Sequence, residues 1–136
     1  MKQFSWTDDL RTGNPLIDGD HRKLVTLINA LFKAMESAQA NDALHKAMND
    51  LIAGTKEHFG REEAEMERIR YVASLAHESE HAKLTRQIVE LKAMLDSGGR
   101  INTPAVADFL SEWLRAHIVT ADMKLAAALK QEARAA

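Results

Sequence analysis

The chain has 136 residues, a formal net charge of −2, 46% hydrophobic and 28% charged residues, and no cysteine. These values are typical of one soluble domain with enough apolar side chains for a single core, and they exclude a disordered chain. The lack of cysteine excludes disulfides, thiolate zinc sites, iron–sulfur clusters, covalent haem and a cysteine nucleophile. The net charge of −2 gives no excess of positive charge for binding a nucleic-acid backbone. Any metal must therefore be held by histidine, aspartate and glutamate.

An irregular arm is expected before the first helix, and strand signals are missing throughout. Four amphipathic helices are predicted over about residues 18–38, 41–69, 74–96 and from 103 into an Ala/Lys-rich tail. Asn41 is a candidate N-cap, Gly98 and Gly99 end the third helix, and Thr103-Pro104 announces the fourth. The pattern predicts an all-α fold, an antiparallel up-down-up-down four-helix bundle with an N-terminal arm.

Membrane insertion is not expected, because no apolar run approaches the ~18 residues needed to span a bilayer. The N-terminal segment has no apolar stretch behind Lys2, so it does not read as a secretory signal. We therefore expect a cytoplasmic location.

Several polar residues occupy positions on the helical stripes that should be buried. Burying imidazoles and a carboxylate costs several kcal/mol unless each group finds a partner, and metal coordination satisfies a whole cluster. With Asp122 added, the candidate ligands are His21, His58, Glu62, His77, His81, His117 and Asp122.

The spacing of these residues supports a shared site. The pairs on the second and third helices are i,i+4, only about 40° apart around the helix. His117 and Asp122 are i,i+5, roughly 140° apart, so Asp122 must lean back toward the site.

The expected topology brings the candidates to one level of the bundle. His21 lies at the start of the first helix, His58 and Glu62 near the end of the second, and the third helix opens with its histidine pair. The fourth helix starts at the opposite end, and its two candidates lie about 21 to 28 Å along it at 1.5 Å per residue. All seven side chains should therefore converge.

Five imidazoles and two carboxylates suit a pair of first-row metal ions, and iron is the natural candidate. One iron would take His77, His81 and His117, and the other His21 and His58. Glu62, Asp122 and a solvent-derived oxygen would bridge them. This assignment leaves one iron a ligand short, where a small molecule could bind.

The segments that carry these ligands are residues 17–21, 58–63, 77–81 and 113–122. Their H…HxxxE…HxxxH…HxxxxD pattern resembles the hemerythrins, specifically the single-domain bacterial proteins. Two positions depart from many relatives: Asp20 replaces glutamine or glutamate, and Val72 replaces proline. Neither is a ligand.

The resemblance implies that residues 1–136 form one hemerythrin-like domain with two iron ions and a bridging oxo or hydroxo group. It implies reversible binding of O2 as a hydroperoxide at the open iron, for storage, transport or delivery rather than catalysis. Two alternatives stay open. One is an oxygen or redox sensor domain read by a signalling partner, and the other is a protein that acts on peroxide or nitric oxide or handles iron. An O2-consuming partner is also left open.

Helical neighbours of the ligands are candidates for the walls of an O2 pocket, with ordinary core packing as the alternative. They are Phe59, Trp113, Leu114 and Ile118. His45, the sixth histidine, is expected at the surface, and Glu63 is expected to be a solvated or outer carboxylate rather than a ligand.

Overall fold

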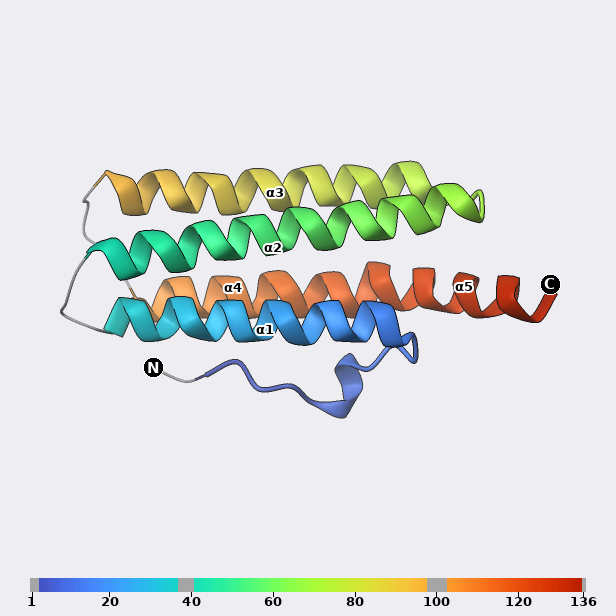
Figure 1. Ribbon diagram of the computed structural model, residues 1–136, viewed down its shortest axis with the longest axis horizontal. Coiled ribbons are helices and arrows are strands. Elements are labelled where there is room, and N and C mark those ends of the chain that lie inside the picture. The colour runs from blue at the N-terminus through green and yellow to red at the C-terminus, as the bar shows by residue number, and fades with distance from the viewer. Residues whose placement is uncertain (1–2, 37–40, 98–102, 136) are drawn as a thin grey trace.

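The computed structural model describes residues 3–36, 41–97 and 103–135. Its long helices are α1 (Pro15–Glu36), α2 (Asn41–Arg68), α3 (Ser74–Asp96), α4 (Thr103–His117) and α5 (Met123–Ala135). A five-residue π-helical segment, η2 (Ile118–Asp122), joins α4 to α5, so these three elements form one continuous fourth helix. The helices run alternately up and down, and α5 extends past the others at one end (Figure 1). The predicted four-helix bundle is confirmed.

The predicted helix bounds are nearly correct at most of the described ends. The first helix begins at Pro15 rather than near residue 18, because Asn14 caps it: the Asn14 side-chain oxygen accepts from the Ile17 N–H at 3.0 Å. Proline suits the first helical position, since its missing N–H is not needed there. The predicted end of that helix at residue 38 and the glycine pair at 98–99 lie outside the described residues, as does the side chain of Asn41.

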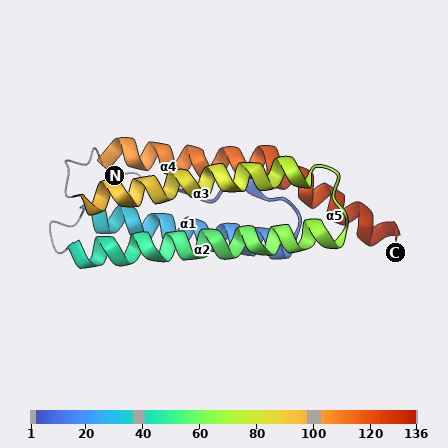
Figure 2. The same cartoon turned by 90° about the horizontal axis from the view of Figure 1, so that it is seen from above.

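The N-terminal arm runs back along the bundle against α1 and α4 (Figure 2). Its short 3-10 turn is η1 (Asp8–Leu10). Both backbone polar groups of Phe4 bond to the side chain of Asn29, at 2.8 and 2.9 Å. The Arg115 guanidinium lies over the Phe4 ring and binds Asp9 at 3.0 Å. The arm is therefore a fixed part of the fold.

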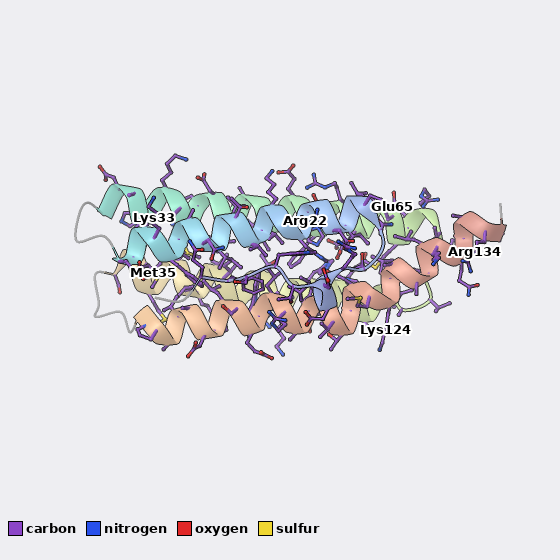
Figure 3. All side chains as sticks on the ribbon, turned by 90° about the horizontal axis from the view of Figure 1, so that it is seen from below. Arg22, Lys33, Met35, Glu65, Lys124 and Arg134 are labelled. Carbon is purple, nitrogen blue, oxygen red and sulfur yellow. The ribbon has the colours of Figure 1, made fainter. Side chains whose placement is uncertain are left out.

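Two apolar clusters fill the bundle. The larger one occupies most of its length and includes Leu24, Leu51, Ile88 and Leu110. The smaller one lies around the α2–α3 turn and α5 and consists of Ile17, Met66, Leu125, Ala126 and Leu129. Charged side chains such as Arg22, Lys33 and Lys124 project outward (Figure 3). Along the helices, the buried candidate ligands fall mainly between these two clusters.

The α2–α3 turn is closed by a Schellman motif with arginine in the glycine position. The Tyr71 N–H bonds to the Met66 carbonyl and the Arg70 N–H to the Glu67 carbonyl, and Arg70 has φ = +53°. A left-handed conformation costs a non-glycine residue about 1–2 kcal/mol.

Replacing Arg70 with glycine is therefore expected to raise the free energy of unfolding by about 1 kcal/mol, because the φ strain is removed. Urea unfolding of the metal-free protein measures the change. Arg70→Ala, which keeps the Cβ, should give no such gain, and an equal gain from alanine would contradict the explanation.

Among the described residues, no helix combines the length and hydropathy needed to cross a membrane.

Candidate metal centre

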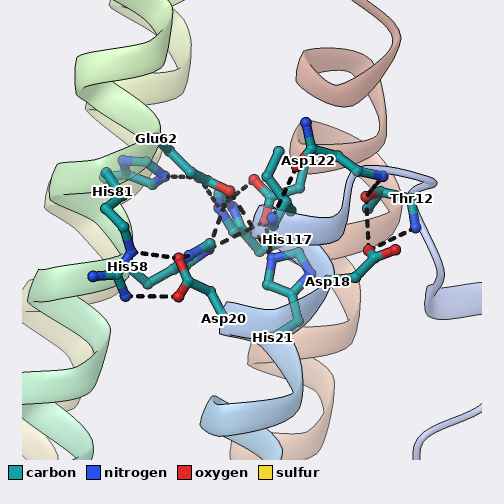
Figure 4. A network of polar contacts seen from close by, with 12 residues as sticks. Thr12, Asp18, Asp20, His21, His58, Glu62, His81, His117 and Asp122 are labelled. Carbon is teal, nitrogen blue, oxygen red and sulfur yellow. Dashed lines mark hydrogen bonds and ion pairs between the residues drawn. The ribbon is translucent and has the colours of Figure 1, made fainter. Parts of the chain in front are cut away.

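The seven predicted ligands meet in the interior of the bundle. The exposed fraction of each is 4% or less. The second turn of α1 provides His21, α2 provides His58 and Glu62, the start of α3 provides His77 and His81, and the fourth helix provides His117 and Asp122. Figure 4 shows imidazoles from several helices directed at the two carboxylates.

The donor atoms divide into two overlapping groups. One group consists of Glu62, His77, His81, His117 and Asp122, and the other of His21, His58, Glu62 and Asp122. Within each group the donor atoms lie within 4.8 Å of one another. Both carboxylates belong to both groups.

The carboxylate oxygens account for this division. Glu62 Oε1 lies 3.1 Å from His77 Nε2 and 2.9 Å from His81 Nε2, whereas Glu62 Oε2 lies 3.0 Å from His58 Nε2. Asp122 Oδ1 lies 3.0 Å from His117 Nε2, and Asp122 Oδ2 lies 2.6 Å from His21 Nε2. Each carboxylate thus offers one oxygen to each group, as a bridging ligand would.

The expectation that Asp122 must lean back is corrected by the π-helical segment. Across η2, the Met123 N–H bonds to the Ile118 carbonyl five residues earlier instead of four. This wider turn brings residues five apart onto one face of the helix, so His117 and Asp122 face the site together. A single-turn π-helix is a frequent feature of functional sites.

The electrostatics of the cluster are those of closely paired opposite charges. Burial acts to lower the pKa of His58, but Asp122 and Glu62 outweigh it and raise that pKa to about 10. The same carboxylates raise the pKa of His77 to about 9 against burial. Burial acts to raise the pKa of Glu62, but the imidazoles hold this pKa well below its ordinary value. Metal ions binding here would have to displace the protons that these raised pKa values keep on His58 and His77.

Four atoms at the centre of the cluster are buried and close together in two pairs, but neither pair has the angles of a hydrogen bond. The pairs are His58 Nε2 with Glu62 Oε2 and His117 Nε2 with Asp122 Oδ1, each at 3.0 Å. An unsatisfied buried polar atom costs about 1–3 kcal/mol, so four together are hard to explain as structural packing. Metal ions would satisfy all of them, and the nitrogen and oxygen donors suit first-row metals.

The four candidate pocket residues are all buried in the larger apolar cluster. The Phe59 ring stacks on His81 with 3.9 Å between ring centroids. The Trp113 indole N–H donates to the Leu84 carbonyl at 3.3 Å. Their role as walls of an O2 pocket stays a prediction.

The two residues set apart from the ligands are outside both donor groups. His45 is 42% exposed and binds Asp96 at 2.7 Å. Glu63 is 38% exposed and lies 3.5 Å from His81 Nδ1.

Three polar residues near the centre were not singled out from the sequence as site residues. Asp20 and Arg61 form an ion pair beside His58. Burial acts to raise the pKa of Asp20, but Arg61 and His58 outweigh it and lower this pKa. Thr55, one turn before His58 on α2, is fully buried and its hydroxyl has no partner among the described residues. The position of Thr55 on the apolar stripe of the second helix was the only sequence signal that its side chain would be buried.

Replacing Thr55 with valine is expected to raise the free energy of unfolding of the metal-free protein by about 1–3 kcal/mol, because it removes an unpaired buried hydroxyl and nearly preserves shape. Chemical denaturation measures the change. Thr55→Ser keeps the hydroxyl and loses a methyl group, so it should destabilise; stabilisation by serine would refute the explanation.

An antiparallel bundle with two donor groups in its core defines this protein as a four-helix bundle with a candidate metal centre. The sequence model described as "Hemerythrin HHE cation binding domain" matches residues 12–129. The chain therefore belongs to the hemerythrin family.

Individual relatives agree with this assignment. The chain is 32% identical over 118 residues to a bacteriohemerythrin of Pseudomonas paraeruginosa, covering 87% of this chain and 76% of the relative. It is 29% identical over 121 residues to a myohemerythrin of Riftia pachyptila, covering 89% of both chains. The crystal structure of a wild-type hemerythrin superimposes with a TM-score of 0.84 at 25% identity, covering 94% of this chain and 98% of the other.

Proposed function

We propose that this protein binds O2 reversibly at a pair of non-haem iron ions. The observation that carries the proposal is the division of one buried cluster into two donor groups that share both carboxylates. His77, His81 and His117 would hold one iron, His21 and His58 the other, and Glu62 and Asp122 would bridge them. The domain responsible would span residues 1–136.

The difference in donor number supports binding of a small molecule. One group has five protein donors and the other has four. With the same bridging oxygen added to both, the second iron has one coordination position fewer filled by the protein. O2 would bind at this position, beside His21 and His58. Its form as a hydroperoxide stays a prediction.

The composition of the cluster favours binding over O2 cleavage. The cluster has five imidazoles and only two carboxylates. Imidazoles are neutral when they bind a metal, and they stabilise high-valent iron less than carboxylates do. Apolar clusters pack on either side of the donor atoms. These features support an O2-binding protein rather than an enzyme, in storage, transport or delivery, with a cytoplasmic location expected.

Iron content and spectroscopy test the proposal directly. We expect two irons per chain and an O–O stretch in the resonance Raman spectrum that disappears on deoxygenation. One metal per chain, or zinc in place of iron, would contradict it. Parallel assays for turnover of peroxide and nitric oxide distinguish a binding protein from an enzyme.

A further inference from the structure

A charged pair connects the candidate metal centre to the surface between α1 and α2. Asp20 Oδ2 accepts from His58 Nδ1 at 2.9 Å, and this contact is drawn in Figure 4. Arg61 holds the same carboxylate at two points: its Nε donates to Asp20 Oδ2 at 2.8 Å and its terminal nitrogen to Oδ1 at 2.6 Å. Arg61 also binds Glu57, one turn earlier on α2, at 2.9 Å.

This arrangement distinguishes His58 from three other imidazoles of the cluster. The Nδ1 atoms of His21, His81 and His117 are buried without a hydrogen-bond partner among the described residues. His58 Nδ1 has a carboxylate held in place by a guanidinium. His58 also belongs to the donor group with fewer protein donors, where the loss of one well-oriented ligand matters more.

We propose that Asp20 and Arg61 form a latch that positions His58 as a ligand of the second metal. Asp20 accepts a hydrogen bond from the Nδ1–H of His58. This contact directs the unprotonated Nε2 into the cluster and makes Nε2 a stronger metal ligand. Arg61 keeps the short, partly exposed Asp20 side chain turned toward His58 by a planar two-point contact. The inference rests on the proposed function only in requiring a metal ion at the His21 and His58 group.

A simpler interpretation is that the pair only ties α1 to α2. Arg61 is 34% exposed, and exposed ion pairs contribute about 0–1 kcal/mol to stability. That role would change the free energy of unfolding and leave the two metal positions equally affected. The latch instead predicts a change confined to one metal position.

Titration of the metal-free protein with cobalt(II), followed by visible absorption, separates the two interpretations. We expect the wild-type protein to take up two equivalents. Asp20→Asn should raise the dissociation constant of one equivalent by about 10–100-fold and leave the other unchanged. Arg61→Gln should weaken the same equivalent by a smaller factor. Urea unfolding of each metal-free variant measures the structural contribution separately.

Arg68 provides a matched control on the same helix. Its guanidinium binds Glu65 through Nε and a terminal nitrogen, away from any candidate ligand. Arg68→Gln should leave both cobalt equivalents unchanged. Arg61→Gln is a surface change, so it keeps the test valid if Asp20→Asn fails to fold.

Weakening of both equivalents alike, or of neither, in the Asp20 and Arg61 variants overturns the latch. Uptake of fewer than two equivalents by the wild-type protein contradicts the proposed function instead. Two equivalents with the selective loss, in a protein whose iron form does not bind O2, would support the latch and refute O2 binding.

Discussion

Glu62→Gln is expected to abolish binding of both metal ions. The Glu62 carboxylate belongs to both donor groups, with one oxygen 2.9 Å from His81 and the other 3.0 Å from His58. The amide keeps the shape but loses the negative charge and one acceptor oxygen. In the metal-free protein, Glu62 contributes to the raised pKa values of His58 and His77, so these two imidazoles depend on its charge. Breaking such a buried network costs about 3–5 kcal/mol in unfolding free energy.

The neighbouring residue is the matched control. Glu63 follows Glu62 on α2, is 38% exposed and lies outside both donor groups. Glu63→Gln should keep two metals per chain and change the unfolding free energy by less than about 0.5 kcal/mol. Metal analysis of the purified chains and urea unfolding measure both quantities. Retention of two metals by Glu62→Gln, or equal loss in both variants, would refute bridging by Glu62.

The helical fold could be predicted because its signals are local. Apolar spacing located all four helices, and the α3 limits were predicted as observed. The error at the start of α1 came from overlooking Asn14-Pro15. This is the same kind of sequence pair as Thr103-Pro104, whose predicted cap lies on a side chain outside the described part of the structure. The course of the arm was not predictable, because it depends on distant contacts such as Phe4 with Asn29.

Convergence of the ligands could be predicted because helix rise and topology determine their level in the bundle. The π-helical segment at residues 118–122 was not predicted, although the sequence holds a signal for it. The i,i+5 spacing of His117 and Asp122 was its signal. In an α-helix that spacing separates two ligands by roughly 140°, which a shared site does not allow without a wider turn.

The Asp20–Arg61 pair was missed for a different reason. Asp20 was noted only as a departure from relatives, arginine is not a metal-ligand type, and the two residues are 41 positions apart. From the sequence alone, Arg61 would be expected to be a solvent-exposed residue next to Glu62. Only the packing of α1 against α2 brings its guanidinium onto Asp20, and Gly54 contributes to that packing. A Cβ there would lie 2.5 Å from a Leu27 methyl group.

The second large effect is expected for Leu114→Ala. Leu114 is 2% exposed in the larger cluster and lies three residues before His117, about 4.5 Å along the helix. Truncating a buried leucine costs about 2–5 kcal/mol and leaves a cavity. If Leu114 shields bound O2, the cavity admits water and the oxygenated protein oxidises faster. Urea unfolding gives the first quantity, and the decay of the oxygenated absorption spectrum in air gives the second.

Leu110→Ala separates the role in shielding from general loss of packing. Leu110 is fully buried one turn earlier on α4, seven residues before His117, about 10.5 Å along the helix. Both variants should lose similar unfolding free energy, because both delete the same buried groups. Only Leu114→Ala should oxidise faster, since only its cavity adjoins the ligands. Equal oxidation rates in the two variants would remove Leu114 from the O2 pocket and leave it as a packing residue.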